Sequence, residues 1–171
     1  MSESKSCFIS CGAEGADTEW LHQAAEHGHQ VVTALPRDTD LEKYREKTKE
    51  IAAILGRGFP TNKPYVDRLL MRNIKAASMT HRIYAIGYCD EYLSIAGGTA
   101  WACYTMMSRD DPSDELFFFD QSKDQWLSYD HGTRRLKKIA DKPPIPSGTW
   151  LGIGSRKLTY VGKNAIQSLW R

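Results

Sequence analysis

Residues 7–35 read CFISCGAEGADTEWLHQAAEHGHQVVTAL, and this stretch decides the fold. It opens with a short apolar strand, residues 7–10, which stops at a turn of small residues. Apolar side chains then recur at helical spacing over residues 17–27, and Gly28 ends that helix before a second apolar run at residues 30–35. A strand, a glycine turn, a helix and a strand within about 30 residues make a βαβ unit, which predicts parallel strands and a right-handed crossover.

The rest of the chain continues this alternation. We expect helices over residues 39–55, 64–79, 99–108 and 162–169, and strands over residues 82–87, 116–119, 126–129 and 150–153. A turn at residues 121–124 joins two strands into a hairpin, and the polar residues 130–148 are predicted to form a long loop. The pattern predicts an α/β fold. We expect a three-layer Rossmann-like sandwich with a mostly parallel sheet and a β-hairpin near the C-terminal part, in a single domain over residues 1–171.

Composition limits the class of protein. With 171 residues, 41% of them hydrophobic and 26% charged, the chain has the make-up of one ordinary globular domain, which excludes wholesale disorder. No apolar run approaches the roughly 18 residues of a membrane span, and the first residues carry no signal-peptide core. We therefore expect a cytoplasmic protein without membrane association. The four cysteines form no CxxC pair, which predicts reduced thiols, and we expect no metal site.

Positive charge is concentrated in the last quarter of the chain. Residues 131–171 hold nine basic side chains and one acidic one, although the net charge of the whole chain is only +2. Two interpretations stay open: a solvated basic face, or a surface for an anionic ligand or a nucleic acid. The run RRLKK at residues 134–138 would be the centre of a nucleic-acid surface, but it contains no aromatic residue on which a base could stack.

Three segments share one shape, in which an apolar strand leads through a turn of small residues into a helix. They are residues 9–17, 95–100 and 153–156. Such turns let backbone N–H groups approach a ligand, and the start of a helix attracts phosphate. In an open parallel sheet these turns all lie at the carboxyl ends of the strands, so we expect them to form one crevice. Arg68 and Arg72, one helical turn apart, could add a guanidinium for a phosphate or a carboxylate.

These segments resemble motifs of one known superfamily. Residues 12–17 (GAEGAD) resemble the GGAxGAD turn of the SMF/DprA–LOG (SLOG) superfamily, which includes the LOG-type cytokinin-activating phosphoribohydrolases. Residues 71–73 (MRN) resemble its RN helix, residues 97–101 (GGTAW) its GGxGT phosphate loop, and the closing GSR also recurs in some members. The resemblance implies a Rossmann-like domain that binds nucleotides or ADP-ribose derivatives as a homodimer or higher homo-oligomer.

The chain departs from the LOG enzymes just after the phosphate loop. Those enzymes carry glutamates there, whereas residues 101–104 read WACY. We therefore expect a binding protein first: a sensor, carrier or sequestering protein for a nucleotide or ADP-ribose-type molecule, with no cofactor required. One alternative is an N-glycosidic-bond hydrolase or transferase acting on nucleoside monophosphates, LOG-like or deoxyribosyltransferase-like, so whether the chain is an enzyme stays open. A second alternative is nucleic-acid binding through the basic C-terminal region.

The candidate site residues come from the three turns, the RN helix and nearby aromatic residues. Glu14 is the catalytic candidate, as a general base or as an acceptor for a ribose hydroxyl. Tyr88 and Trp101 are candidates for stacking on a base, and Asp17 is also expected to cap its helix. The candidates for ligand and phosphate binding are Gly12, Ala13, Gly15, Ala16, Asp17, Arg72, Asn73, Gly97, Gly98, Thr99, Ala100, Ser155 and Arg156.

Overall fold

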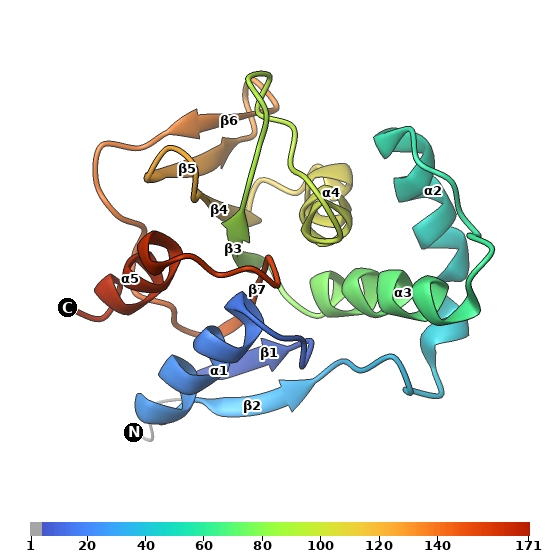
Figure 1. The fold of residues 1–171 in the computed structure, drawn as a ribbon, viewed down its shortest axis with the longest axis horizontal. Coiled ribbons are helices and arrows are strands. Elements are labelled where there is room, and N and C mark those ends of the chain that lie inside the picture. Colours follow the sequence, from blue (N-terminus) through green and yellow to red (C-terminus); the bar gives the residue numbers. More distant parts are fainter. Residues whose placement is uncertain (1–4) are drawn as a thin grey trace.

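The fold is built around one seven-stranded sheet with helices on both faces (Figure 1). The computed structural model describes residues 5–171. In chain order the strands are β1 (Cys7–Ser10), β2 (Gln30–Thr33), β3 (Arg82–Gly87), β4 (Glu115–Asp120), β5 (Gln125–Asp130), β6 (Arg135–Lys138) and β7 (Thr149–Gly154). The helices are α1 (Ala16–Glu26), α2 (Arg45–Leu55), α3 (Pro64–Ser78), α4 (Thr99–Arg109) and α5 (Tyr160–Ser168), and a 3₁₀ turn covers Leu41–Tyr44.

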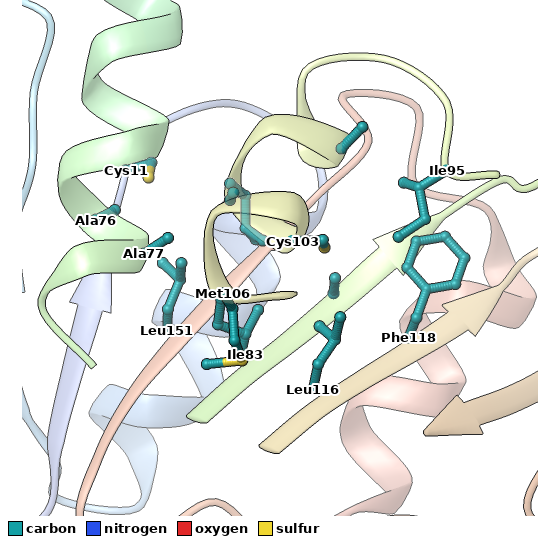
Figure 2. Packing of buried hydrophobic residues seen from close by; sticks show 14 of the residues in the cluster. Cys11, Ala76, Ala77, Ile83, Ile95, Cys103, Met106, Leu116, Phe118 and Leu151 are labelled. Atoms are coloured by element: carbon teal, nitrogen blue, oxygen red, sulfur yellow. The ribbon is translucent and has the colours of Figure 1, made fainter. Parts of the chain in front are cut away.

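Alternate side chains of the central strands belong to two separate cores. On β3, Ile83 and Ala85 pack in the core under α3 and α4, whereas Tyr84 and Ile86 pack in the core under α1 and α5. Figure 2 shows the first of these cores, with side chains of α3 and α4 lying over those of the strands. Because both faces of the strand are apolar and covered, the sheet is the middle of three layers, and the predicted α/β sandwich is confirmed.

The order of the strands places the candidate loops side by side. The sheet runs β2-β1-β7-β3-β4-β5-β6, with parallel pairing from β2 to β4 and antiparallel pairing in β4–β5 and β5–β6. The chain leaves β1 toward one edge of the sheet and leaves β3 toward the other, and β7 inserts between them. The carboxyl ends of β1, β7 and β3 therefore meet at a switch in strand direction, where open α/β sheets form a crevice.

One element differs from the expectation. Residues 130–148 were predicted to be a loop, but residues 135–138 form β6, the last strand of the sheet. This strand has a single buried side chain, Leu136, between exposed basic ones, so its apolar signal is too short to recognise. Charged side chains on an edge strand discourage pairing with other chains. The basic run therefore has a structural role at an edge of the sheet that is remote from β1, β7 and β3.

Two loops at this switch approach each other at Gly15, which has a φ of +79°. A Cβ atom there would collide with the backbone carbonyl of Arg156, in the loop after β7. Gly28 has a similar φ of +75° but has open space around the same position.

We expect both alanine substitutions to destabilise the protein, by unequal amounts. Gly28→Ala should cost about 1 kcal/mol, the strain of a left-handed residue. Gly15→Ala should cost a further 1–3 kcal/mol or so, because it also forces two backbones apart. Urea unfolding followed by circular dichroism measures both losses, and equal losses would show that the two loops are not in close contact.

Candidate functional site

Two adjoining cavities lie at the carboxyl edge of the sheet. The β2-side cavity, of about 520 Å³, is lined by Cys11, Gly12, Ala13, Glu14, Leu35, Pro36, Arg37, Tyr65, Leu69, Arg72 and Arg156. The β3-side cavity, of about 540 Å³, is lined by Ala13, Asp17, Val66, Leu69, Leu70, Arg72, Asn73, Tyr88, Ala96, Gly97, Gly98, Thr99, Ile153, Gly154, Ser155, Arg156 and Lys157. Ala13, Leu69, Arg72 and Arg156 line both cavities. We call the two together the edge crevice.

Arg72 lies at the junction of the two cavities. Its side chain projects from α3 and is 8% exposed. Nη1 donates to the carbonyl oxygen of Cys11 at 3.2 Å, and Nε and Nη2 donate to Oδ1 of Asn73 at 3.2 and 3.1 Å. These acceptors are neutral, and among residues 5–171 no carboxylate oxygen lies within 4 Å of the guanidinium. A guanidinium has five N–H donors, so this buried cation keeps donors and positive charge for an anion.

The thiol of Cys11 does not supply that anion. Cys11 is buried beside Arg72, and burial raises the pKa of its thiol far above its ordinary value. The thiol therefore stays protonated and neutral at physiological pH, and only the backbone of Cys11 contacts Arg72.

Asn73 connects Arg72 to the glycine loop after β3. Its Nδ2 donates to the carbonyl oxygen of Gly98 at 3.0 Å, while its Oδ1 accepts hydrogen bonds from the guanidinium of Arg72. From the other side, Nη1 of Arg57 donates to the carbonyl oxygen of Gly97 at 2.8 Å. The pair Gly97-Gly98 is thus held by two side chains, which fixes the start of α4 at the wall of the β3-side cavity.

The starts of α1 and α4 are not equivalent. Gly98 precedes the first residue of α4, no side chain caps this end, and Gly98 and Thr99 line the β3-side cavity. This is the arrangement that favours phosphate at a helix start. At α1, by contrast, the N–H of Ala16 donates to the carbonyl oxygen of Ser155 at 3.0 Å. Gly15 and Ala16, which were expected to bind phosphate, instead lie where the two loops meet, and they line neither cavity.

Asp17 occupies the first turn of α1 and lines the β3-side cavity. Its side chain is 2% exposed, Oδ1 accepts the N–H of Gly154 at 3.1 Å, and Oδ2 has no hydrogen-bond partner among the described residues. Burial raises the pKa of this carboxyl from its ordinary 3.8 to about 6, although the charge of Arg72 lowers it. Asp17 is therefore a largely ionised, incompletely paired carboxylate at neutral pH.

Several other candidates are placed by the structure. Glu14 is exposed and lines the β2-side cavity, Tyr88 is 37% exposed and lines the β3-side cavity, and Arg156 is exposed at both. Trp101 is only 3% exposed and belongs to a buried apolar cluster with Ile51 of α2. The expectation that Trp101 stacks on a base is corrected.

Two further residues lie outside the crevice. Ala100 is buried in the core and lines neither cavity. Arg68 donates to the backbone carbonyls of Pro36 and Asp38, so it holds the segment after β2 instead of facing a ligand. The two arginines that share a stripe on α3 therefore differ in their partners: Arg68 is bonded to the segment after β2, whereas Arg72 lines both cavities.

The structure adds lining residues that the sequence did not indicate. Arg37 and Tyr65 complete the β2-side cavity, and Lys157 the β3-side cavity. None belongs to a glycine turn. Lys157 follows Arg156 directly and could have been included by adjacency, whereas Arg37 and Tyr65 carry no local signal.

The sequence also did not indicate one group of side chains of the types that can bind a metal ion. His81, Asp111 and Asp114 place one ligand atom each within 4.8 Å of one another, although 33 residues separate the ends of the group. Asp114 is buried and already bonded: His81 Nδ1 lies 2.6 Å from Oδ1, and Nε of Arg109 donates to Oδ2 at 3.1 Å. Asp114 therefore links His81, just before β3, to Arg109 at the end of α4.

Comparisons with protein-family models, curated proteins and solved structures each found no match for this chain. Within residues 5–171, none of the helices combines the length and the apolar character needed to cross a bilayer.

We expect Asp17→Asn to stabilise the protein at neutral pH. Because the pKa is higher in the folded chain, the folded chain binds more protons than the unfolded chain between about pH 4 and 6. The charged form thus costs up to about 3 kcal/mol above pH 6, and that cost disappears as the pH falls toward 4. Urea unfolding of the two proteins from pH 4 to 8 measures the difference.

Asp67→Asn is the matched control for this measurement. Asp67 is also buried, but its Oδ1 accepts the N–H and the hydroxyl of Thr61 at 2.8 and 2.6 Å. Neutralising it should weaken these bonds and give no gain in stability. A gain for Asp67→Asn that equals the gain for Asp17→Asn would contradict a special cost at Asp17.

Proposed function

We propose that the chain binds a nucleotide or an ADP-ribose-type molecule in the edge crevice and acts as a sensor, carrier or sequestering protein. The observation that carries the proposal is the state of Arg72, a buried guanidinium without a carboxylate partner at the junction of two cavities. A buried charge is costly unless it is paired, so a ligand that brings an anionic group is strongly favoured there.

The lining of the crevice supports a ligand with a polar and an apolar part. Arg37, Arg72 and Arg156 make the β2-side cavity predominantly cationic, with Glu14 as its acidic residue. The β3-side cavity carries apolar side chains from α3 and β7, and Tyr88 offers an exposed ring. Each cavity lies within the usual range of about 300–1,000 Å³ for small-molecule sites. A phosphate-bearing sugar attached to a flat base matches both the cationic lining of the β2-side cavity and the apolar lining of the β3-side cavity.

The resemblance to SLOG proteins supports the same proposal. The three motifs that carry it, GAEGAD, MRN and GGTAW, contribute Ala13, Arg72 and Gly98 to the edge crevice. Membership of that superfamily and the homo-oligomer that it implies stay predictions. Light scattering coupled to gel filtration tests the oligomer directly.

Arg72→Ala should weaken the binding of nucleotides by about 1.5–3 kcal/mol, roughly ten- to 150-fold, because it removes a charge-assisted hydrogen bond. Isothermal titration calorimetry with AMP, GMP, CMP, UMP, NAD and ADP-ribose measures the change. Arg134→Ala is the control: Arg134 pairs with Asp110 on the surface and belongs to the basic run RRLKK. Wild-type affinity in Arg72→Ala would place the ligand elsewhere, and loss of affinity in Arg134→Ala would favour the basic C-terminal region.

A second candidate function is cleavage of an N-glycosidic bond. It is favoured by the presence of two carboxylates, Glu14 and Asp17, among the residues that line the crevice. Such a reaction needs a carboxylate to activate water or to stabilise positive charge on the sugar.

If the chain is a hydrolase, incubation with nucleoside monophosphates should release free base that liquid chromatography detects. Glu14→Gln should then lower the rate at least about 100-fold, the usual contribution of general acid–base catalysis. Nucleotides that bind but stay intact through long incubation would leave binding alone as the function.

A further inference from the structure

Asp17 is the buried polar group of the crevice that the described part of the chain leaves incompletely paired. Oδ1 is held by the N–H of Gly154, and Oδ2 has no hydrogen-bond partner among the described residues. The backbone N–H groups of Ala13 and Asp17 lie near enough to lower the pKa of the carboxyl, but they leave Oδ2 without a bond of good geometry. The residue is 2% exposed and lines the β3-side cavity. Buried polar atoms of folded proteins nearly always have a partner. A carboxylate oxygen without one, at the wall of a cavity, is therefore a place for a hydrogen-bond donor on the ligand.

We propose that Oδ2 of Asp17 accepts a hydrogen bond from a hydroxyl of the ligand's ribose, so that the crevice selects ribonucleotides over deoxyribonucleotides. This inference rests on the proposed nucleotide function and adds to it the residue that distinguishes ribose from deoxyribose. It differs from the expectation at Glu14, which is exposed on the β2-side cavity.

The two buried charged residues of the β3-side cavity, Arg72 and Asp17, need different partners in a ligand. Arg72 has donors to offer, and Asp17 has an acceptor, yet they do not form an ion pair within 4 Å. Each is held in place by other groups: Asp17 by Gly154, and Arg72 by Asn73 and Cys11. A nucleotide carries an anionic phosphate and neutral hydroxyl donors on one sugar ring, so a single ligand can satisfy both groups. Inorganic phosphate would satisfy Arg72 alone.

The charge around Asp17 selects a neutral donor over a cationic one. Four other charged or titratable residues line the same cavity: Arg72 of α3, Arg156 and Lys157 of the loop after β7, and Tyr88 just after β3. Cys11, in the loop after β1, lies near Asp17 outside this lining. Arg72, Arg156 and Lys157 are cationic, and burial raises the pKa of the Cys11 thiol, which keeps it neutral. An ammonium group in the ligand would be repelled by three positive charges, whereas a hydroxyl is not. The sugar hydroxyl is therefore favoured over an amine.

The decisive measurement compares sugars on a constant base. AMP, GMP, CMP and UMP, with their 2′-deoxy and 3′-deoxy forms, are titrated calorimetrically into the wild-type chain, Asp17→Ala, Asp17→Asn, Asp67→Asn and Arg72→Ala. We expect the wild-type chain to bind the ribose form at least tenfold more tightly than the form that lacks the contacted hydroxyl. In Asp17→Ala this ratio should fall to less than twofold.

The other variants separate this role from a structural one. Asp17→Asn keeps the bond to Gly154 but loses the charge, so its ratio should lie between those of the wild-type chain and Asp17→Ala. Asp67→Asn, outside the crevice, should keep the wild-type ratio. Melting temperatures of all variants establish that they are folded.

Three results would overturn the inference: equal affinity of the wild-type chain for ribose and deoxyribose forms, a wild-type ratio in folded Asp17→Ala and Asp17→Asn, or a preference that follows the base and ignores the sugar. Failure of the proposed function looks different. In that case no nucleotide binds, or nucleotides bind with equal affinity to the wild-type chain and Arg72→Ala, and the inference fails with it.

Discussion

The guanidinium of Arg72 is the group around which the carboxyl edge of the sheet is organised. It joins α3 to the loop after β1 through the carbonyl of Cys11, and through Asn73 it joins α3 to Gly98 in the loop after β3. The loops that it connects are far apart in the sequence. A buried cation with neutral partners destabilises a protein, so the two apolar cores of the sheet must offset its cost.

Small residues are needed at this edge for a physical reason that differs from loop to loop. Gly15 allows the loop after β1 to lie against the loop after β7, where a Cβ would meet the backbone of Arg156. Gly154, at the end of β7, leaves room for the carbonyl of Ile86 and the side chain of Ala16. Gly97 supplies a left-handed residue, with φ +69°, and Gly98 leads into α4 without a side-chain cap. One result is that the start of α1 is closed by Ser155 while the start of α4 lines the crevice. Similar sequence patterns thus lead to a contact between two loops at the turn before α1 and to an uncapped helix start at the turn before α4.

Much of the fold could be predicted from the sequence because its determinants are local. The turn after β1, the apolar face of α3 and the β4–β5 hairpin depend on spacings within a few residues. The position of β7 between β1 and β3 could not be predicted, since pairing of strands about 140 residues apart in the chain leaves no local trace.

The candidate site shows the same division between local and distant determinants. Ala13, Gly98 and Arg72 were identified as neighbours because βα turns converge in any open parallel sheet. The environment of Trp101 was wrongly predicted because it depends on α2, which packs against α4 and places Ile51 in the same apolar cluster. The role of Arg57 was missed for a similar reason. It reaches Gly97 from 40 residues earlier in the chain, so no sequence window contains both partners.

The most informative feature of the crevice is that its opposite charges are kept apart. If Arg72 and Asp17 formed an ion pair, each would satisfy the other and the cavity would have little need of a ligand. Instead, Gly154 holds Asp17 in the first turn of α1, and Asn73 and Cys11 hold Arg72 on α3. Both groups remain buried, charged and incompletely bonded, which lowers the stability of the free protein. A ligand that carries an acceptor and a donor at the right separation recovers that lost stability as binding energy. The two buried charges lower the stability of the free protein, and the same two charges explain why this edge of the sheet would bind a ligand selectively.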